Sequence, residues 1–320
     1  MKRRSLYPIP VMLSLGGVIM MAMQLGCAGA NANRSQTPPP SGSPAGVPVV
    51  AHVFVVIDEN HGYDDVIGNP AMPYLNSLAG QYALAMQYYS NTHPSLPNYL
   101  MLATGNLVTD TDAFTGTVTS DNVARAILAA NKSWKIYAED LPDVGYTGPT
   151  IVPYDKNHNP FAYLSDVAND STQAANMVPF TQLATDMQSN TLPDYGMIIP
   201  DMANDGHDCP NEAPPCTETK TLSNVDNWIK TNVSPLINSS QFSNSVMILT
   251  WDEAEDSDTT HGGGHIATIL VGSAVKRGYQ SANLYQHEST LRLTMELLGI
   301  SDFPGEAATA PDMAEFFTGN

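Results

Sequence analysis

The stretch SVMILTWDE, residues 245–253, is the strongest strand signal in the chain. Its continuous apolar, β-branched run is typical of a buried strand, and it ends in the acidic pair Asp252-Glu253. A similar run, AHVFVVID at 51–58, leads directly into Glu59, Asn60 and His61. Runs of this kind are characteristic of parallel sheets that are covered on both faces.

Working outward from these two runs, the pattern alternates between strands and helices. Further strands are predicted at 132–140, 195–200 and 265–272, and helices at 72–85, 98–105, 120–131, 179–190, 225–237 and 288–299. Alternation of this kind predicts an α/β fold, a three-layer α/β/α sandwich with a mostly parallel central sheet. We expect one domain over residues 49–320.

The first residues have the pattern of an export signal rather than of a folded element. Residues 1–27 combine a basic start, a short apolar run and a small-residue end, and the apolar run is shorter than a membrane span needs. The sequence around Cys27 resembles a lipoprotein cleavage box, and ordinary cleavage after Ala30 or Ala32 is the alternative. Residues 28–48 are predicted to be a flexible tether. The protein is therefore expected in the cell envelope, periplasm or medium.

The net charge of the chain restricts the classes of molecule that it can bind. The 320-residue chain has a formal net charge of −19, which repels nucleic acid and anionic lipid, so contact with a membrane is expected only through a lipid on Cys27. An acidic protein that acts on an anionic substrate needs a local positive centre, and a bound metal ion can supply one.

Cys209 and Cys216 are predicted to form a disulfide loop, because only His207 is nearby to complete a zinc site.

Polar clusters follow several predicted strands. Because ligands of open α/β sheets bind beyond the carboxyl ends of the strands, we expect these clusters to converge. Carboxylate, amide and imidazole ligands suit hard to borderline divalent cations. The candidate metal ligands are Glu59, Asn60, Asp205, His207, Asp252, Glu253 and His265.

The segment THPSLPNYL, residues 92–100, places hydroxyl groups on a proline-stiffened loop before a predicted helix. A helix N-terminus favours an anion, and a serine there, beside a metal, can attack phosphorus. Ser95 is the predicted nucleophile, with Thr92 as the competing hydroxyl. Asn98 is in position to donate to a phosphoryl oxygen from the same turn.

Taken together, these motifs resemble the phosphoesterase family of bacterial and fungal acid phosphatases and phospholipase C-type enzymes, within the alkaline phosphatase superfamily. The resemblance covers about residues 51 to 300. It is carried by VVIDENHGYDD, THPSLPNYLMLATG, WKIYAEDLP, HNPF, LPDYGMIIPDMANDGHD, LTWDEAED, HIATILVG and HESTLRLTMELLG.

The resemblance implies metal-assisted hydrolysis of a small phosphate ester through a serine or threonine. The predicted metal ligands and Ser95 occupy matching motif positions, and His158 matches a segment in which a histidine could contact phosphate. Protonation of the leaving group would fall to His207, His158 or water. Two-zinc members carry Asp-His where this chain has Asp252-Glu253, which favours one main metal ion.

The short chain and the Gly-Tyr-Asp sequence after His61 favour the acid-phosphatase branch, which hydrolyses monoesters. Lys156, His158 and Lys135 are candidates for binding the additional phosphate charge of a monoester. One alternative is a phospholipase C-type or nucleotide phosphodiesterase activity on diesters. Another is a non-catalytic surface lipoprotein on the same scaffold.

Overall fold

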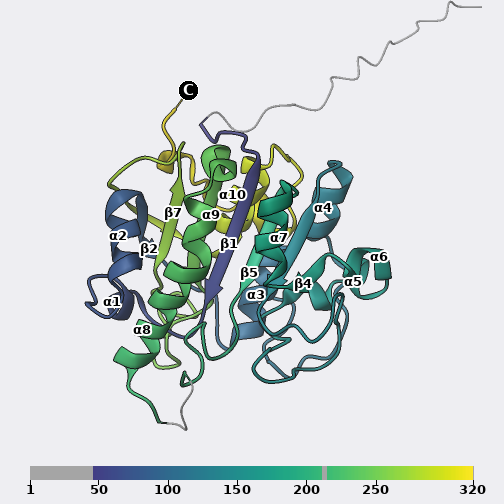
Figure 1. The fold of residues 1–320 in the computed structure, drawn as a ribbon, viewed down its shortest axis with the longest axis horizontal. Helices are drawn as coiled ribbons and strands as arrows, with labels where there is room; N and C mark the ends of the chain where they lie inside the picture. The colour runs from purple at the N-terminus through teal and green to yellow at the C-terminus, as the bar shows by residue number, and fades with distance from the viewer. Residues whose placement is uncertain (1–45, 211–214, 320) are drawn as a thin grey trace, which may run out of the picture. The chain divides into compact units, whose positions relative to one another are not determined.

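The computed structural model of the chain describes residues 46–210 and 215–319 (Figure 1). The predicted signal segment 1–27, Cys27 and all of the predicted tether except residues 46–48 lie outside the described residues. Among the residues that are described, no helix combines the length and apolar character needed to cross a membrane.

An eight-stranded sheet forms the centre of the described chain, with the order β4-β3-β5-β1-β6-β7-β2-β8. The strands are β1 (His52–Asp58), β2 (Ala83–Tyr88), β3 (Trp134–Ala138), β4 (Met177–Pro179), β5 (Tyr195–Ile199), β6 (Ser245–Trp251), β7 (Thr268–Gly272) and β8 (Tyr279–Tyr285). Strand β7 runs antiparallel to its neighbours β6 and β2, and the other neighbouring pairs are parallel. The predicted mostly parallel sheet is confirmed.

Helices cover both faces of this sheet. The α-helices are α1 (Tyr63–Val66), α2 (Pro73–Gln81), α3 (Ser95–Thr104), α4 (Val123–Ala129), α5 (Ser165–Ala168), α6 (Ser171–Ala174), α7 (Gln182–Ser189), α8 (Glu218–Trp228), α9 (Ser234–Ile237) and α10 (His287–Leu297). Helix α3 packs against α10 and α4, and α2 packs against α8. Figure 1 shows α8 and α9 in front of the sheet and α3 and α10 behind it, which confirms the three-layer architecture.

Shorter helical segments complete the described chain. They are the 3₁₀ segments η1 (Pro160–Tyr163), η3 (Ser240–Asn244), η4 (Gly305–Ala308) and η5 (Ala314–Phe316), and the π-helical segment η2 (Ile229–Val233). Segment η2 lies between α8 and α9, so the predicted helix at 225–237 is not one regular α-helix.

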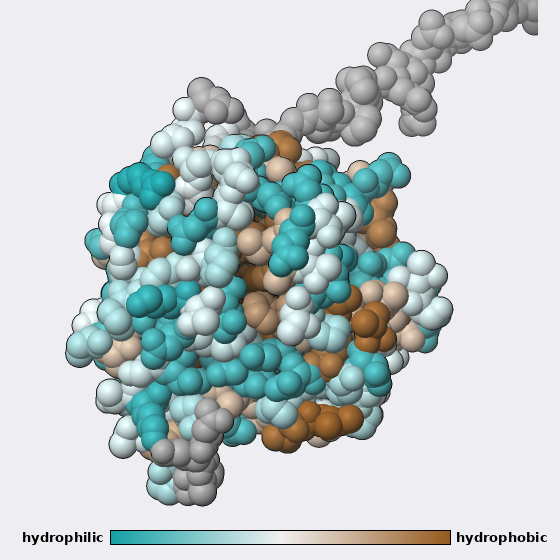
Figure 2. All heavy atoms as spheres, in the orientation of Figure 1, coloured by the Kyte–Doolittle hydropathy of each residue, from teal (hydrophilic) through white to brown (hydrophobic). Residues whose placement is uncertain are grey.

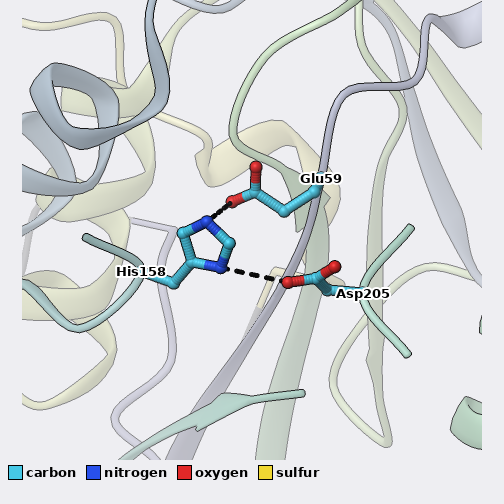
Figure 3. A group of neighbouring side chains, drawn as sticks. All are labelled: Glu59, His158 and Asp205. Carbon is cyan, nitrogen blue, oxygen red and sulfur yellow. Dashed lines mark ion pairs between the residues drawn. The ribbon is translucent and has the colours of Figure 1, made fainter. Parts of the chain in front are cut away.

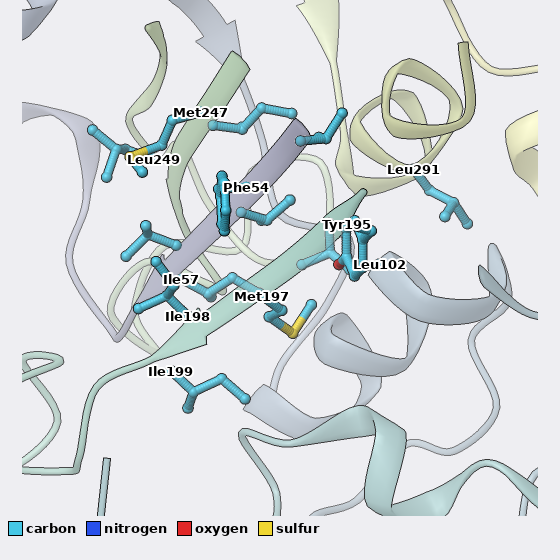
Figure 4. Packing of buried hydrophobic residues seen from close by; sticks show 14 of the residues in the cluster. Phe54, Ile57, Leu102, Tyr195, Met197, Ile198, Ile199, Met247, Leu249 and Leu291 are labelled. Carbon is cyan, nitrogen blue, oxygen red and sulfur yellow. The ribbon is translucent and has the colours of Figure 1, made fainter. Parts of the chain in front are cut away.

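The two central strands owe their position to their apolar sequences. Every residue of β6 is buried, as is every residue of β1 after His52. The strands pair in parallel, so that Asp58 lies beside Trp251 and the acidic residues after both strands emerge at one edge of the sheet. Figure 4 shows the core packing around Phe54 of β1, Met197 of β5 and Met247 of β6.

The surface contrasts with this interior. Figure 2 shows a mainly polar face on which apolar residues occupy small, separate areas. The large hydrophobic residues that are exposed in the described chain are Val49, Leu107, Leu128, Val144, Ile151, Val152 and Leu284.

Gly196 in β5 is required by close packing. A Cβ at this position would lie 2.5 Å from Cδ1 of Phe54, well inside van der Waals contact. We expect Gly196→Ala to lower the free energy of unfolding by about 1–3 kcal/mol through overpacking. Gly80→Ala in α2 is the control, because no atom lies within 4 Å of its added Cβ; it should stabilise by roughly 0.5–1 kcal/mol. Urea unfolding of both variants tests this, and equal stability of Gly196→Ala and wild type would show that the Phe54 ring can yield.

Part of the predicted secondary structure was wrong. The predicted helix at 72–85 ends as α2 at Gln81, and Ala83–Tyr88 forms β2. The apolar residues Ala83, Leu84 and Ala85 fit a helical spacing, but all three are buried within the sheet. Strands β4 and β8 were not predicted.

The predicted pairing of Cys209 with Cys216 is confirmed as a disulfide. It closes a loop between β5 and α8, on the side of the sheet edge where the acidic residues gather. Residues 211–214 within this loop lie outside the described chain.

Candidate functional site

Three loops converge at the carboxyl ends of β5, β1 and β6, as predicted. Strand β1 lies between the other two, and the backbone links the loops directly. The amide of Glu59 donates to the carbonyl of Asp205 at 2.8 Å, and the amide of Asp252 donates to the carbonyl of Asp58 at 3.0 Å. These contacts place five buried carboxylate side chains at one edge of the sheet: Asp58, Glu59, Asp205, Asp252 and Glu253.

Ser95 is the first residue of α3 and points into this carboxylate group. Its Oγ lies 3.1 Å from Oε2 of Glu59 and 3.3 Å from Oε1 of Glu253. Its side chain is buried at the helix start, and residue 94, a proline, forms the N-cap. Thr92, the competing hydroxyl, instead donates its Oγ1 hydrogen to the carbonyl of His93 at 3.0 Å.

Asn98 secures the loop before Ser95. Its Oδ1 accepts from the amides of Asn91 and Thr92, each at 3.2 Å. Its Nδ2 donates to the carbonyl of Thr92 at 2.7 Å and approaches Oε2 of Glu253 at 3.3 Å. Asn98 therefore holds the loop and the helix start in one arrangement.

His158 links two of the buried carboxylates (Figure 3). Its Nε2 lies 3.3 Å from Oε1 of Glu59, and its Nδ1 lies 3.0 Å from Oδ2 of Asp205. Burial lowers the pKa of His158, but the hydrogen bond and charge of Asp205 outweigh it, so that the pKa is raised. Tyr99 stacks on the imidazole, with ring centroids 5.3 Å apart, and donates to Oε1 of Glu59 at 2.6 Å.

The concentration of buried negative charge defines the electrostatics of the site. Burial, followed by repulsion from neighbouring carboxylates, raises the pKa values of Asp58 and Glu59 well above their ordinary range and that of Glu253 to about 9. Burial also raises the pKa of Asp252 to about 6. In the described part of the chain, only histidines form ion pairs with this group.

This donor set fits a divalent cation. Both carboxylate oxygens of Asp58 and Oδ2 of Asp252 are buried without a hydrogen-bond partner. Uncompensated buried carboxylates are unfavourable unless they are protonated or bound to a cation. The nearby oxygen and nitrogen ligands are those that hard to borderline metals prefer, and Glu59, His158 and Asp205 bring ligand atoms within 4.8 Å of one another.

The other predicted ligands occupy different places. Asn60 lies at the site, where its backbone amide donates to Oδ1 of Asp252 at 3.2 Å. His207 lies near the cavity wall, with its Nδ1 3.2 Å from Oδ1 of Asp208. His265 is not brought to the carboxylates. Its Nε2 bonds to the carbonyl of Met86 at 2.9 Å, and its ring stacks between two tyrosines.

The position of Lys135 also does not fit its predicted role in binding phosphate. Its Nζ pairs with Oδ2 of Asp186 at 2.6 Å, so its charge is engaged at that carboxylate. Lys156 remains beside the site, because it lines a cavity of about 370 Å³ that shares Asp112 with the main cavity.

The main cavity opens directly onto Ser95. It has a volume of about 620 Å³, which is enough for a small phosphate ester. Its lining residues are Asn60, Pro94, Ser95, Asp112, His207, Glu253, Glu255, Asp256 and Ser257.

Several residues at the site were not among the predicted ones. His93 contacts Oε2 of Glu253 with Nδ1 at 3.0 Å and the carbonyl of Asp258 with Nε2 at 2.9 Å. His287 bonds to the carbonyl of Asp252 at 2.7 Å. Tyr99 could have been found from its spacing, because it lies four residues after Ser95 on the same helix face.

The sequence pattern of the phosphoesterase family matches residues 68–301. The chain belongs to the phosphoesterase family. Ser95, Asp205 and Asp252 lie within the matched region, and Glu59 precedes it. Family membership makes the chain a phosphoric ester hydrolase, as predicted.

Named relatives agree with this assignment. The chain is 30% identical to a phosphatidylinositol-3-phosphatase of Mycobacterium tuberculosis, over 85% of this chain and 84% of the relative. It is 29% identical to a probable acid phosphatase of Kluyveromyces lactis, over 74% of this chain and 56% of that protein. It is 30% identical to an acid phosphatase of Aspergillus fumigatus, over 74% of this chain and 52% of that protein. The match thus spans about half the length of these fungal relatives.

Solved structures share the fold at low sequence identity. An alkaline phosphatase superfamily protein from Vibrio parahaemolyticus has a TM-score of 0.62 at 12% identity, with 84% of this chain and 72% of that chain covered. The murine ectonucleotide pyrophosphatase/phosphodiesterase 5 has a TM-score of 0.56 at 10% identity, with 83% of this chain and 100% of that chain covered. These similarities show that the chain shares the fold of these two proteins.

Proposed function

We propose that the chain is an exported, metal-dependent phosphomonoesterase of the acid-phosphatase type, with Ser95 as its nucleophile. The observation that carries this proposal is the position of Ser95 Oγ, which lies at a helix N-terminus between the carboxylates of Glu59 and Glu253 and faces the main cavity. The relatives named as acid phosphatases support the same reaction class.

The metal ligands in this proposal are Glu59, Asn60, Asp252 and Glu253, with Asp205 and His158 adjoining them. A bound divalent cation would supply positive charge against the phosphoryl oxygens and favour ionisation of the serine hydroxyl. Tyr99 orients Glu59 through a hydrogen bond and His158 through an ion-pair contact, and His93 orients Glu253 through a hydrogen bond. Fixed orientation matters because positioning dominates catalysis of phosphoryl transfer.

The reaction proceeds in two displacements. Ser95 Oγ forms a bond to phosphorus as its proton passes to Glu59 or Glu253, and the bond from phosphorus to the leaving oxygen breaks. His207 lines the cavity and is the better donor of a proton to that oxygen, because His158 is buried between Glu59 and Asp205. Water then attacks phosphorus and gives up a proton to His207, the bond to Oγ breaks, and Ser95 regains its proton from Glu59 or Glu253.

The smaller cavity is proposed to bind the leaving group. Lys156 lies over the ring of Tyr163, with Nζ 4.3 Å from the ring centroid, and Phe114 packs against the same ring. This combination of a cation and aromatic faces suits a leaving group that is planar or that carries an additional anion. The 30% identical phosphatidylinositol-3-phosphatase makes a phosphorylated headgroup one reasonable class.

Export is part of the proposal. The signal pattern of residues 1–27 and the Cys209–Cys216 disulfide both favour it, because disulfides persist mainly in oxidising compartments. Anchoring through Cys27 or release after cleavage at Ala30 or Ala32 would each be compatible.

Substrate preference tests the proposal. We expect the purified chain to release para-nitrophenol faster from para-nitrophenyl phosphate than from its bis-ester, and a chelator to remove the activity until a divalent cation is restored. Cleavage of the diester alone would replace the proposal with the phosphodiesterase alternative. Full activity in chelator would contradict the metal requirement.

A further inference from the structure

A second group of potential ligands lies beside the active site. His61 follows β1, Asp65 lies in α1, and Glu218 is the first residue of α8. One ligand atom from each of the three lies within 4.8 Å of the others. None of them belongs to the cluster of Glu59, His158 and Asp205.

A further carboxylate joins this group. Ligand atoms of Asp65 and Glu218 lie within 4.8 Å of each other. A Cβ added to Gly62 would lie 3.0 Å from Oδ2 of Asp65 and 3.2 Å from Oε2 of Glu255, so Glu255 reaches the same side of Asp65. Neighbouring carboxylates repel one another, and a shared proton or a cation between them relieves the repulsion.

His61 is the observation that points to a ligand. Its side chain is only 9% exposed, and neither Nδ1 nor Nε2 has a hydrogen-bond partner. One of its ring nitrogens lies within 4.8 Å of a carboxylate oxygen of Asp65 and of a carboxylate oxygen of Glu218. A buried imidazole without a partner is unfavourable, and coordination of a metal would satisfy it.

We propose that His61, Asp65 and Glu218, with Glu255 alongside, bind a second divalent cation. One imidazole nitrogen with several carboxylate oxygens suits Zn²⁺ or Mn²⁺. The ion would join the loop after β1 and the adjacent helix α1 to the start of α8, which lies far away in the sequence. Because Glu255 also lines the main cavity, the ion would fix one wall of the cavity.

Metal stoichiometry tests this second site. The chelator-treated full chain is titrated with Mn²⁺, and bound ions are counted by electron paramagnetic resonance. We expect the double variant Asp65→Asn, Glu218→Gln to bind one Mn²⁺ fewer per chain than wild type. Asp64→Asn is the matched control, because Asp64 is exposed on the same helix outside the cluster and its loss should leave the count unchanged.

The comparison remains decisive if the proposed active-site metal is wrong. In that case wild type binds one ion and the double variant none, which supports the second site alone. Equal counts in wild type and double variant overturn it. Glu218→Gln alone guards against misfolding, because Glu218 is exposed at a helix start; we expect at least tenfold weaker Mn²⁺ binding at one site, and unchanged affinity would also overturn the proposal.

Discussion

Ser95→Ala is expected to lower the turnover of phosphate esters by roughly 10³–10⁶-fold, in line with the loss of other activated nucleophiles. The physical reason is that Oγ is the hydroxyl held between Glu59 and Glu253 at the mouth of the cavity. Single-turnover and steady-state assays on para-nitrophenyl phosphate measure the effect. Mn²⁺ binding should persist, because the carboxylates remain.

Thr92→Ala is the matched control for this experiment. Thr92 donates its hydroxyl hydrogen to the backbone of His93 and does not reach the carboxylates, so the variant should keep most of its activity. Acid quenching of the wild-type reaction should also trap one phosphoryl group on the peptide that contains Ser95. A Ser95→Ala variant that works at full rate would transfer the nucleophile assignment to Thr92.

Glu59→Gln is expected to abolish activity and at the same time to stabilise the chelated protein. Glu59 is buried among like charges, and its partners Tyr99 and His158 can still contact a glutamine. The raised pKa of Glu59 opposes folding at neutral pH, so replacement by an amide should raise the free energy of unfolding by roughly 1–3 kcal/mol in chelator. Thermal unfolding in chelator and with Mn²⁺ measures both effects, because wild type should gain more from the metal than the variant.

Asp186→Asn is expected to have the opposite effect on the free energy of unfolding. This buried carboxylate accepts from Lys135 at 2.6 Å and from Tyr137 at 2.7 Å, so its charge is compensated. Its neutralisation should lower the free energy of unfolding by roughly 1.5–3 kcal/mol. If Glu59→Gln destabilised the chelated protein as much as Asp186→Asn does, the carboxylates at the site would not be in electrostatic conflict.

The strand-end residues could be predicted because their pattern is local. A continuous apolar run marks a buried strand, and the residues after it must emerge at the sheet edge where ligands bind. This reasoning found Glu59, Asp205 and Asp252. It could not find β8, in which most residues are exposed and which therefore lacks a strand-like apolar pattern.

Side-chain partners required the tertiary structure. His158 and His265 look alike as isolated histidines in the sequence, yet one bridges Glu59 and Asp205 while the other bonds to a backbone carbonyl. Lys135 could not be excluded from phosphate binding until Asp186 was seen beside it. Each of these contacts joins residues far apart in the chain, and local periodicity carries no information about them.

The sequence by itself determined the α/β class, the acidic strand ends, the helix that begins near Ser95 and the Cys209–Cys216 loop, because each depends on neighbouring residues and on backbone geometry. Only the tertiary structure decided which side chains meet. The order of the strands brings β5, β1 and β6 together, and the loops after them then place buried carboxylates against one another and against Ser95. Burial of apolar residues elsewhere in the molecule stabilises this packing. The packing in turn creates the uncompensated negative charge on which the proposed chemistry depends.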